Sequence, residues 1–186
     1  MKSLIKLKYF VFLLIVLFSV SCSRADEDED VLSQEDISNI ILNVQDDITG
    51  ITTTYNYTVN STTNPDIKLT DGKTYTVNAV FLNGNEDETQ SIIEAKDEHF
   101  LLFSFQNADI DLKRIDAESA VRSDGKRIGL TTKWTVIKAE NGKNPQLVLT
   151  LIHDASSVNE EKSGSVFGTV QGGETDAMAT YEISNL

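Results

Sequence analysis

The sequence is poor in residues that build covalent or metal cross-links, and poor in positive charge. It has one cysteine among 186 residues, so it can form neither an intramolecular disulfide nor a thiolate metal cluster. Lysine and arginine number 16 against 29 aspartates and glutamates, a formal net charge of −13. This excess of acid disfavours binding to phosphate backbones. We therefore expect no nucleic-acid partner.

The signatures of common enzymes are also missing. The sequence contains no Gly-x-Ser-x-Gly stretch, which serine hydrolases of the nucleophile-elbow type require. The glycines within 163–173 precede a segment that is typical of a strand, whereas glycine-rich phosphate loops lead into a helix. We predict that the chain has no catalytic residue and is not an enzyme.

The beginning of the chain has the parts of an export signal. Three lysines precede an apolar run over 9–20, which is too short for a membrane-spanning helix. Small Ser21 stands directly before Cys22, an arrangement that resembles the lipobox of bacterial lipoproteins, in which the cysteine carries the lipid. We predict that residues 1–21 are a signal peptide and that Cys22 is lipidated. The alternative is an ordinary secretory signal cleaved near Ala25.

An acidic segment follows the cysteine. Residues 26–30 are five consecutive acids, and such a run repels itself and stays extended. We predict that residues 22–36 form a tether between a lipid anchor in the membrane and a domain over 37–186. An acidic segment behind a lipidated cysteine also resembles the surface-export signal of Bacteroidota lipoproteins. That resemblance implies an outer-membrane protein at the cell surface.

The remainder of the chain shows a period of two. Apolar and polar residues alternate in short segments that turn residues separate, which is typical of strands. Seven or eight such segments, without a long helical period, predict an all-β fold, an antiparallel immunoglobulin-like sandwich. The inward-facing residues of the clearest strands would be Ile40, Leu42, Val44, Tyr75, Val77, Ala79, Phe81, Leu101, Phe103, Phe105, Thr132, Trp134, Val136, Leu147, Leu149, Leu151, Ala177, Ala179, Tyr181 and Ile183.

Less regular segments are assigned by composition. The Thr- and Tyr-rich stretch from Ile51 to Val59 predicts an edge strand. Residues 107–127 are predicted to be irregular, with a short helical turn near Ala117. Asn141-Gly142 is expected to turn a hairpin, and residues 154–173 are expected to form a loop.

Two histidines are the candidate metal ligands. His99 begins one predicted strand and His153 ends another, and each has the parity of buried leucines. Glu174 and Asp176 stand just before the last predicted strand. If these strand ends meet, two imidazoles and one or two carboxylates form a zinc or copper site. The alternative is that each histidine is a strand-end residue hydrogen-bonded to a nearby carboxylate, with Asp97 and Glu98 available to orient the imidazole.

Calcium is a further alternative. Asn83, Asn85 and Asp87 have the alternating oxygen spacing of a calcium loop. The glycine at the sixth position and the late glutamate of such loops are missing here.

Several stretches together resemble a family of small Bacteroidota lipoproteins whose members stand beside TonB-dependent outer-membrane transporters in some genomes. The resemblance covers most of the chain after Cys22. It implies a non-enzymatic accessory or ligand-binding domain with such a transporter as partner; a structural or adhesive surface module is the other expectation. It implies no ligand and no catalytic residue. The stretches are residues 69–75, 81–83, 97–99, 127–130, 149–153 and 172–176.

Overall fold

The computed structural model describes residues 37–186. The predicted signal peptide, the lipidation site Cys22 and the acidic tether lie outside the described residues. Among residues 37–186, no helix has both the length and the apolar character needed to cross a bilayer.

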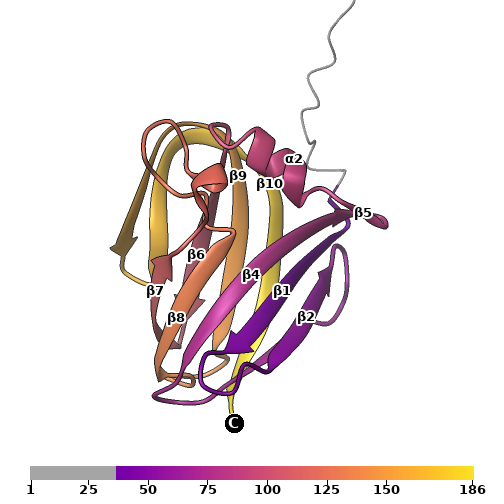
Figure 1. Ribbon diagram of the computed structural model, residues 1–186. Coiled ribbons are helices and arrows are strands. Elements are labelled where there is room, and N and C mark those ends of the chain that lie inside the picture. The colour runs from indigo at the N-terminus through magenta and orange to yellow at the C-terminus, as the bar shows by residue number, and fades with distance from the viewer. Residues whose placement is uncertain (1–36) are drawn as a thin grey trace, which may run out of the picture. The chain divides into compact units, whose positions relative to one another are not determined.

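The described residues form two β-sheets (Figure 1). All strand pairs are antiparallel except that of β3 with β10. The all-β sandwich predicted from the alternation is confirmed, while its immunoglobulin-like type stays a prediction. The six-stranded sheet contains, in spatial order, β2 (Thr52–Thr58), β1 (Asn39–Asp46), β4 (Thr74–Asn83), β8 (Thr131–Lys138) and β7 (Asp109–Arg114), with β5 (Glu86–Asp87) beside β4. The four-stranded sheet contains β3 (Asp66–Leu69), β10 (Val166–Asn185), β6 (His99–Gln106) and β9 (Gln146–Ser163).

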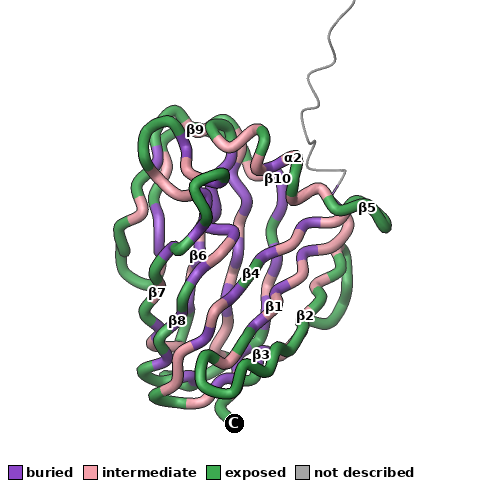
Figure 2. Tube along the Cα trace, viewed as in Figure 1, coloured by how far each residue is buried: buried purple, intermediate pink, exposed green. Residues whose placement is uncertain are grey.

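The core lies between the two sheets and follows the predicted parity. Every residue predicted to face inward is buried, and Figure 2 shows buried and exposed positions alternating along the strands. Trp134 packs edge-on against Phe105 with ring centroids 5.2 Å apart. Tyr181 donates its hydroxyl to the Ile40 carbonyl at 2.7 Å, which ties one sheet to the other. Burial raises the pKa of Tyr181, so this donor keeps its proton.

Four features of the structure differ from the sequence-based assignments. The described residues contain ten strands, not seven or eight, because the turn after β4 includes the two-residue strand β5 and residues 107–127 include β7 as well as the short 3-10 helix Glu118–Ala120. A short helix that was not predicted, α2 (Thr89–Glu94), stands before β6. Asn141-Gly142 does not turn a hairpin, because β8 belongs to one sheet and β9 to the other.

The largest difference concerns residues 154–173. They are not a loop, because β9 and β10 run through them as two long arms of a hairpin. Figure 1 shows this hairpin arching over the end of the sandwich that lies away from the C-terminus. Near the tip, Val166 and Phe167 pair with Ser104 and Phe103 of β6, so the hairpin curls back onto the sheet that it started from.

The hairpin bends where its two arms carry irregular backbone. Asp154 has φ 54° in β9, and Gly172 and Gly173 have φ 66° and 81° in β10. A Cβ atom on Gly173 would lie 2.7 Å from the His153 carbonyl oxygen, so only glycine fits this crossing. The bend places His153 and the start of the final arm beside the first residue of β6.

Candidate metal site at the bend of the long hairpin

The two histidines are cross-strand neighbours. His99 of β6 lies directly opposite His153 of β9 in the antiparallel register. Their rings stack with centroids 5.0 Å apart and planes 19° apart. Directly opposed residues of an antiparallel pair project to the same face of the sheet. The two strand ends therefore meet, which is the condition that the metal-site hypothesis requires.

Asp176 joins the histidines because of a β-bulge. Thr175 pairs with Ile152 and Ala177 pairs with Leu151, so Asp176 is the extra residue between them. A bulge re-aims a side chain that strict alternation would point outward. The Asp176 side chain is only 7% exposed and lies against both imidazoles.

The inner half of the site is His99 with Asp176. The Nδ1 atom of His99 is 3.0 Å from the Ala95 carbonyl oxygen. A carbonyl can only accept, so Nδ1 carries the hydrogen and a neutral ring then has its lone pair on Nε2. That Nε2 faces Asp176 Oδ2 at 3.5 Å. Both atoms are buried, and neither has a hydrogen-bond partner among residues 37–186.

The outer half is His153 with the residues at the rim. Its Nδ1 lies 3.8 Å from Asp176 Oδ1, while its Nε2 lies 3.4 Å from Glu98 Oε2 and 3.9 Å from Asp154 Oδ1. The His153 side chain is 12% exposed, whereas Glu98 and Asp154 are exposed. His153 thus stands between the buried aspartate and the solvent.

The spacing of His99 Nε2 and Asp176 Oδ2 suits a shared cation better than a direct hydrogen bond. A charged N–H to carboxylate bond is usually about 2.7–2.9 Å long. Two ligands of one tetrahedral zinc ion, each about 2.0–2.2 Å from the metal, are separated by about 3.3–3.6 Å. The contact between His99 Nε2 and Asp176 Oδ2, at 3.5 Å, falls in that range.

The surroundings fix the inner ligands. The Ala95 carbonyl holds the His99 ring through Nδ1, which is the usual second partner of a metal-bound histidine. Arg122 donates Nη1 to the His99 carbonyl at 2.9 Å and to the Lys96 carbonyl at 3.2 Å. The Asp154 amide donates to the Glu98 carbonyl at 2.8 Å, and this bond fastens the hairpin bend to the start of β6.

The structure gathers three of the four predicted ligands. His99, His153 and Asp176 lie together, but Glu174 is exposed. Its backbone pairs with His153, while its carboxylate makes no ion pair among residues 37–186. Glu174 and Asp176 have the same parity in the sequence, and only the bulge separates their roles.

Two neighbouring acids have roles that the sequence did not settle. Glu98 contacts His153, the histidine of the opposite strand. Asp97 instead accepts the Ser123 amide at 2.6 Å, and this bond lowers the pKa of Asp97. Asp154 was not predicted as a ligand, although it directly follows His153 in the sequence. The sequence signal that could have identified Asp154 is its position next to a histidine at the end of a predicted strand.

The calcium alternative concerns a different hairpin. Asn83 pairs with Glu86 in the β4–β5 turn. Asp87 Oδ1 accepts the Thr89 amide at 2.9 Å at the start of α2. These contacts explain the polar residues of the turn as local structure, and calcium binding there stays a prediction.

Comparison with known proteins gives no family for this chain. No protein-family model matches it, and no curated protein and no solved structure matches it. The class is therefore defined by the fold alone, an antiparallel β-sandwich with a histidine–aspartate cluster at one end. The resemblance to small Bacteroidota lipoproteins stays a prediction.

Proposed function

We propose that this protein is a non-enzymatic, lipid-anchored domain of the outer membrane that binds one divalent transition-metal ion through His99, Asp176 and His153. The observation that carries the proposal is the pair of buried atoms His99 Nε2 and Asp176 Oδ2. They face each other at 3.5 Å, and each lacks a hydrogen-bond partner among residues 37–186. Leaving such groups buried without partners is costly, and a cation between them removes that cost.

The donor set favours zinc or copper. Two imidazoles and a carboxylate are ligands that borderline metals prefer, whereas magnesium and calcium prefer oxygen alone. Glu98 contacts His153 at Nε2, at 3.4 Å, whereas Asp176 faces Nδ1, so Glu98 can orient the ring from the other side. The rim position of His153 gives the ion a path from solvent.

The anchor is proposed from the sequence. The apolar run, Ser21-Cys22 and the acids that follow support lipidation and display at the cell surface. Stable anchoring needs more than one acyl chain, which a lipidated N-terminal cysteine supplies. A metal-binding domain held at the outer membrane suits capture of an ion for a TonB-dependent transporter, and this partner stays a prediction.

Calorimetric titration of the full chain with zinc and with copper tests the metal site. We expect one ion per chain, and we expect His99→Ala combined with His153→Ala to abolish binding. Glu174→Gln is the matched control, because it removes an acid beside the cluster without touching it. Unchanged stoichiometry in the double variant would refute the site.

Lipidation is tested separately by growth with labelled fatty acid. Label should enter the wild-type chain and be absent from Cys22→Ala. Label that persists in Cys22→Ala would contradict the anchor. Capture from mild-detergent membranes, with mass spectrometry of the eluate, then tests for a transporter partner.

A further inference from the structure

The open edges of the two sheets are protected unequally. Proteins usually defend an edge strand with charge, proline, a bulge or short length. The β7 edge has four charged residues among its six, and the β3 edge is four residues long. The β3 edge is also covered, because the Lys68 amide donates to the Tyr55 hydroxyl at 3.0 Å.

Strand β2 has none of these defences. It is seven residues long, Thr-Thr-Thr-Tyr-Asn-Tyr-Thr, with no charged residue and no proline. Its ladder with β1 runs without a register shift. The β1 residues opposite its outward side chains are also uncharged, namely Asn39, Ile41, Asn43 and Gln45. On a chain with a net charge of −13, this is where two copies can approach with the least repulsion.

The backbone direction of β2 follows from the two ends of its ladder. The Val59 amide donates to Ser38 and the Ile51 carbonyl accepts from Asp46, so odd-numbered residues face β1. Hydrogen-bonding direction alternates along an antiparallel strand. Thr52, Thr54, Asn56 and Thr58 therefore turn their N–H and C=O groups to the open edge. Among these, the Thr58 carbonyl accepts the Ser61 amide at 3.0 Å.

We propose that β2 pairs with β2 of a second copy, antiparallel about a two-fold axis at Tyr55, so that the six-stranded sheets of both copies become continuous. In this register Thr54 lies opposite Asn56 of the second copy and hydrogen-bonds with it. Thr52 lies opposite Thr58. An isologous contact of this kind closes as a dimer and does not extend into a fibre.

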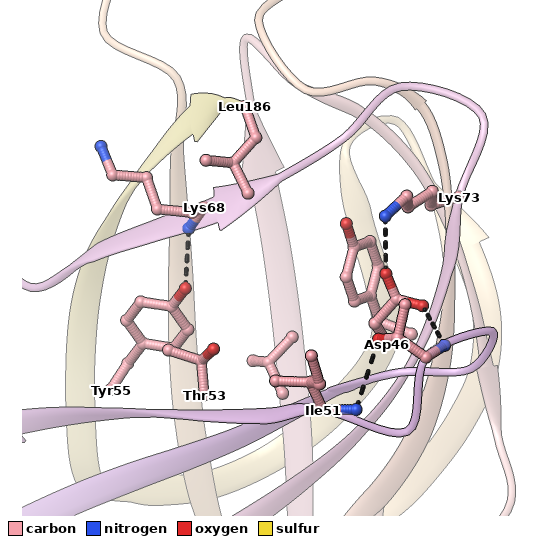
Figure 3. A pocket seen from close by; sticks show the side chains of 10 residues that line it. Asp46, Ile51, Thr53, Tyr55, Lys68, Lys73 and Leu186 are labelled. Atoms are coloured by element: carbon pink, nitrogen blue, oxygen red, sulfur yellow. Dashed lines mark hydrogen bonds and ion pairs between the residues drawn. The ribbon is translucent and has the colours of Figure 1, made fainter.

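The same register covers an exposed apolar residue. Ile51 is 67% exposed and falls opposite Val59 of the second copy. A hollow of about 240 Å³ lies beside β2. Figure 3 shows Ile51, Thr53 and Tyr55 along one side of it, with Leu186 and Lys68 across from them. Leu186 is 74% exposed. The hollow lies on the inner face of the six-stranded sheet, and a strand added beside β2 would extend its wall.

The test uses the full chain with Cys22→Ser, so that no native thiol interferes. Sedimentation should show a dimer for this chain and for Thr54→Val, which keeps the backbone donor. Thr54→Pro deletes an outward N–H but leaves the ladder with β1 intact, so it should be monomeric with an unchanged circular dichroism spectrum. If Thr54→Pro unfolds, the cross-linking experiment described next tests the dimer without it.

Cross-linking tests the register. Thr54→Cys and Asn56→Cys chains, mixed and oxidised, should form a disulfide between unlike chains, because hydrogen-bonded pairs have Cα atoms about 5.5 Å apart. Each variant oxidised alone should cross-link at least tenfold less. A monomeric parent chain, or equal cross-linking in the mixture and in the single variants, would overturn the proposal.

Discussion

Two buried polar clusters differ in how completely their atoms are paired. Arg114 of β7 donates Nη1 to the Ile128 carbonyl at 2.7 Å and Nη2 to the Leu101 carbonyl at 2.6 Å. Its guanidinium also lies 4.2 Å from the ring centre of Phe100. Burial lowers its pKa to about 10, so it stays charged at neutral pH. The histidine cluster, by contrast, leaves His99 Nε2 and Asp176 Oδ2 facing each other without a hydrogen-bond partner among residues 37–186.

This difference is the one we expect between a structural role for Arg114 and the proposed metal-binding role of the histidine cluster. A buried charge that donates to several backbone carbonyls is satisfied by the fold and holds loops and strands together. Arg114 does so for β6 and for Ile128, and one atom, Nε, remains without a partner. A lone pair on His99 Nε2 that faces a carboxylate has no partner among residues 37–186, and this is the observation on which the proposed metal site rests.

The largest expected effect on stability comes from a substitution in the Arg114 cluster. Arg114→Met should lower the free energy of unfolding by at least about 3 kcal/mol, because it strips buried carbonyls of their donors. Lys113→Met, at an exposed position on the same strand, should change it by less than about 0.5 kcal/mol. Urea denaturation measures both. Equal effects would contradict a structural role for Arg114.

The next effect concerns metal-linked stability. Zinc at one hundred times its dissociation constant should stabilise the wild-type chain by about 2.7 kcal/mol. Asp176→Asn should lose this gain, while its metal-free unfolding free energy changes by less than about 1 kcal/mol, because the carboxylate forms no hydrogen bond at Oδ2. If Asp176→Asn instead lost much of its metal-free unfolding free energy and was still stabilised by zinc as the wild type is, Asp176 would have a structural role.

The bend that builds the site should be sensitive to a methyl group. Gly173→Ala places Cβ against the His153 carbonyl, whereas Gly164→Ala, also at positive φ, meets nothing within 4 Å. Both variants incur backbone strain, and Gly173→Ala should cost about 1–2 kcal/mol more. Thermal unfolding of both variants, with and without zinc, measures this difference in stability. Equal losses of stability in the two variants would argue against a rigid bend.

The smallest effect lies outside both clusters. Asp46 accepts from Lys73 Nζ at 2.7 Å and from two turn amides, and these bonds lower its pKa to about 2. Its stabilisation is present above the ordinary aspartate pKa and is lost as pH falls toward 2. The gap in unfolding free energy between wild type and Asp46→Asn should therefore narrow in acid. A gap that does not change with pH would contradict this account.

Much of the fold was predictable because each strand buries one face. The alternation of Tyr75 through Phe81, for example, could only fit one side of a half-buried strand. The same reasoning did not predict strands in the arms of the long hairpin. Val158 is the one buried residue between Ala155 and Ser163, so little apolar pattern marks that segment as a strand.

The candidate site was predictable in part. The alternation of each strand predicted that His99 and His153 face inward. Which acid contacts them depends on a β-bulge, and no local sequence pattern predicts that bulge. Register shifts near Gly172 and at Asp176 move the acids relative to the strand, so Asp176 turns in and Glu174 turns out. Long-range register, which sets the contact between Glu98 and His153, is likewise not contained in local pattern.

The most direct test of the central claim is anomalous diffraction at the zinc absorption edge from crystals of the full chain grown with zinc. The account predicts one peak bonded to His99 Nε2, Asp176 and His153, and no such peak in Asp176→Asn. A fully occupied zinc ion elsewhere, with His99 Nε2 and Asp176 still facing each other unbridged, would contradict it.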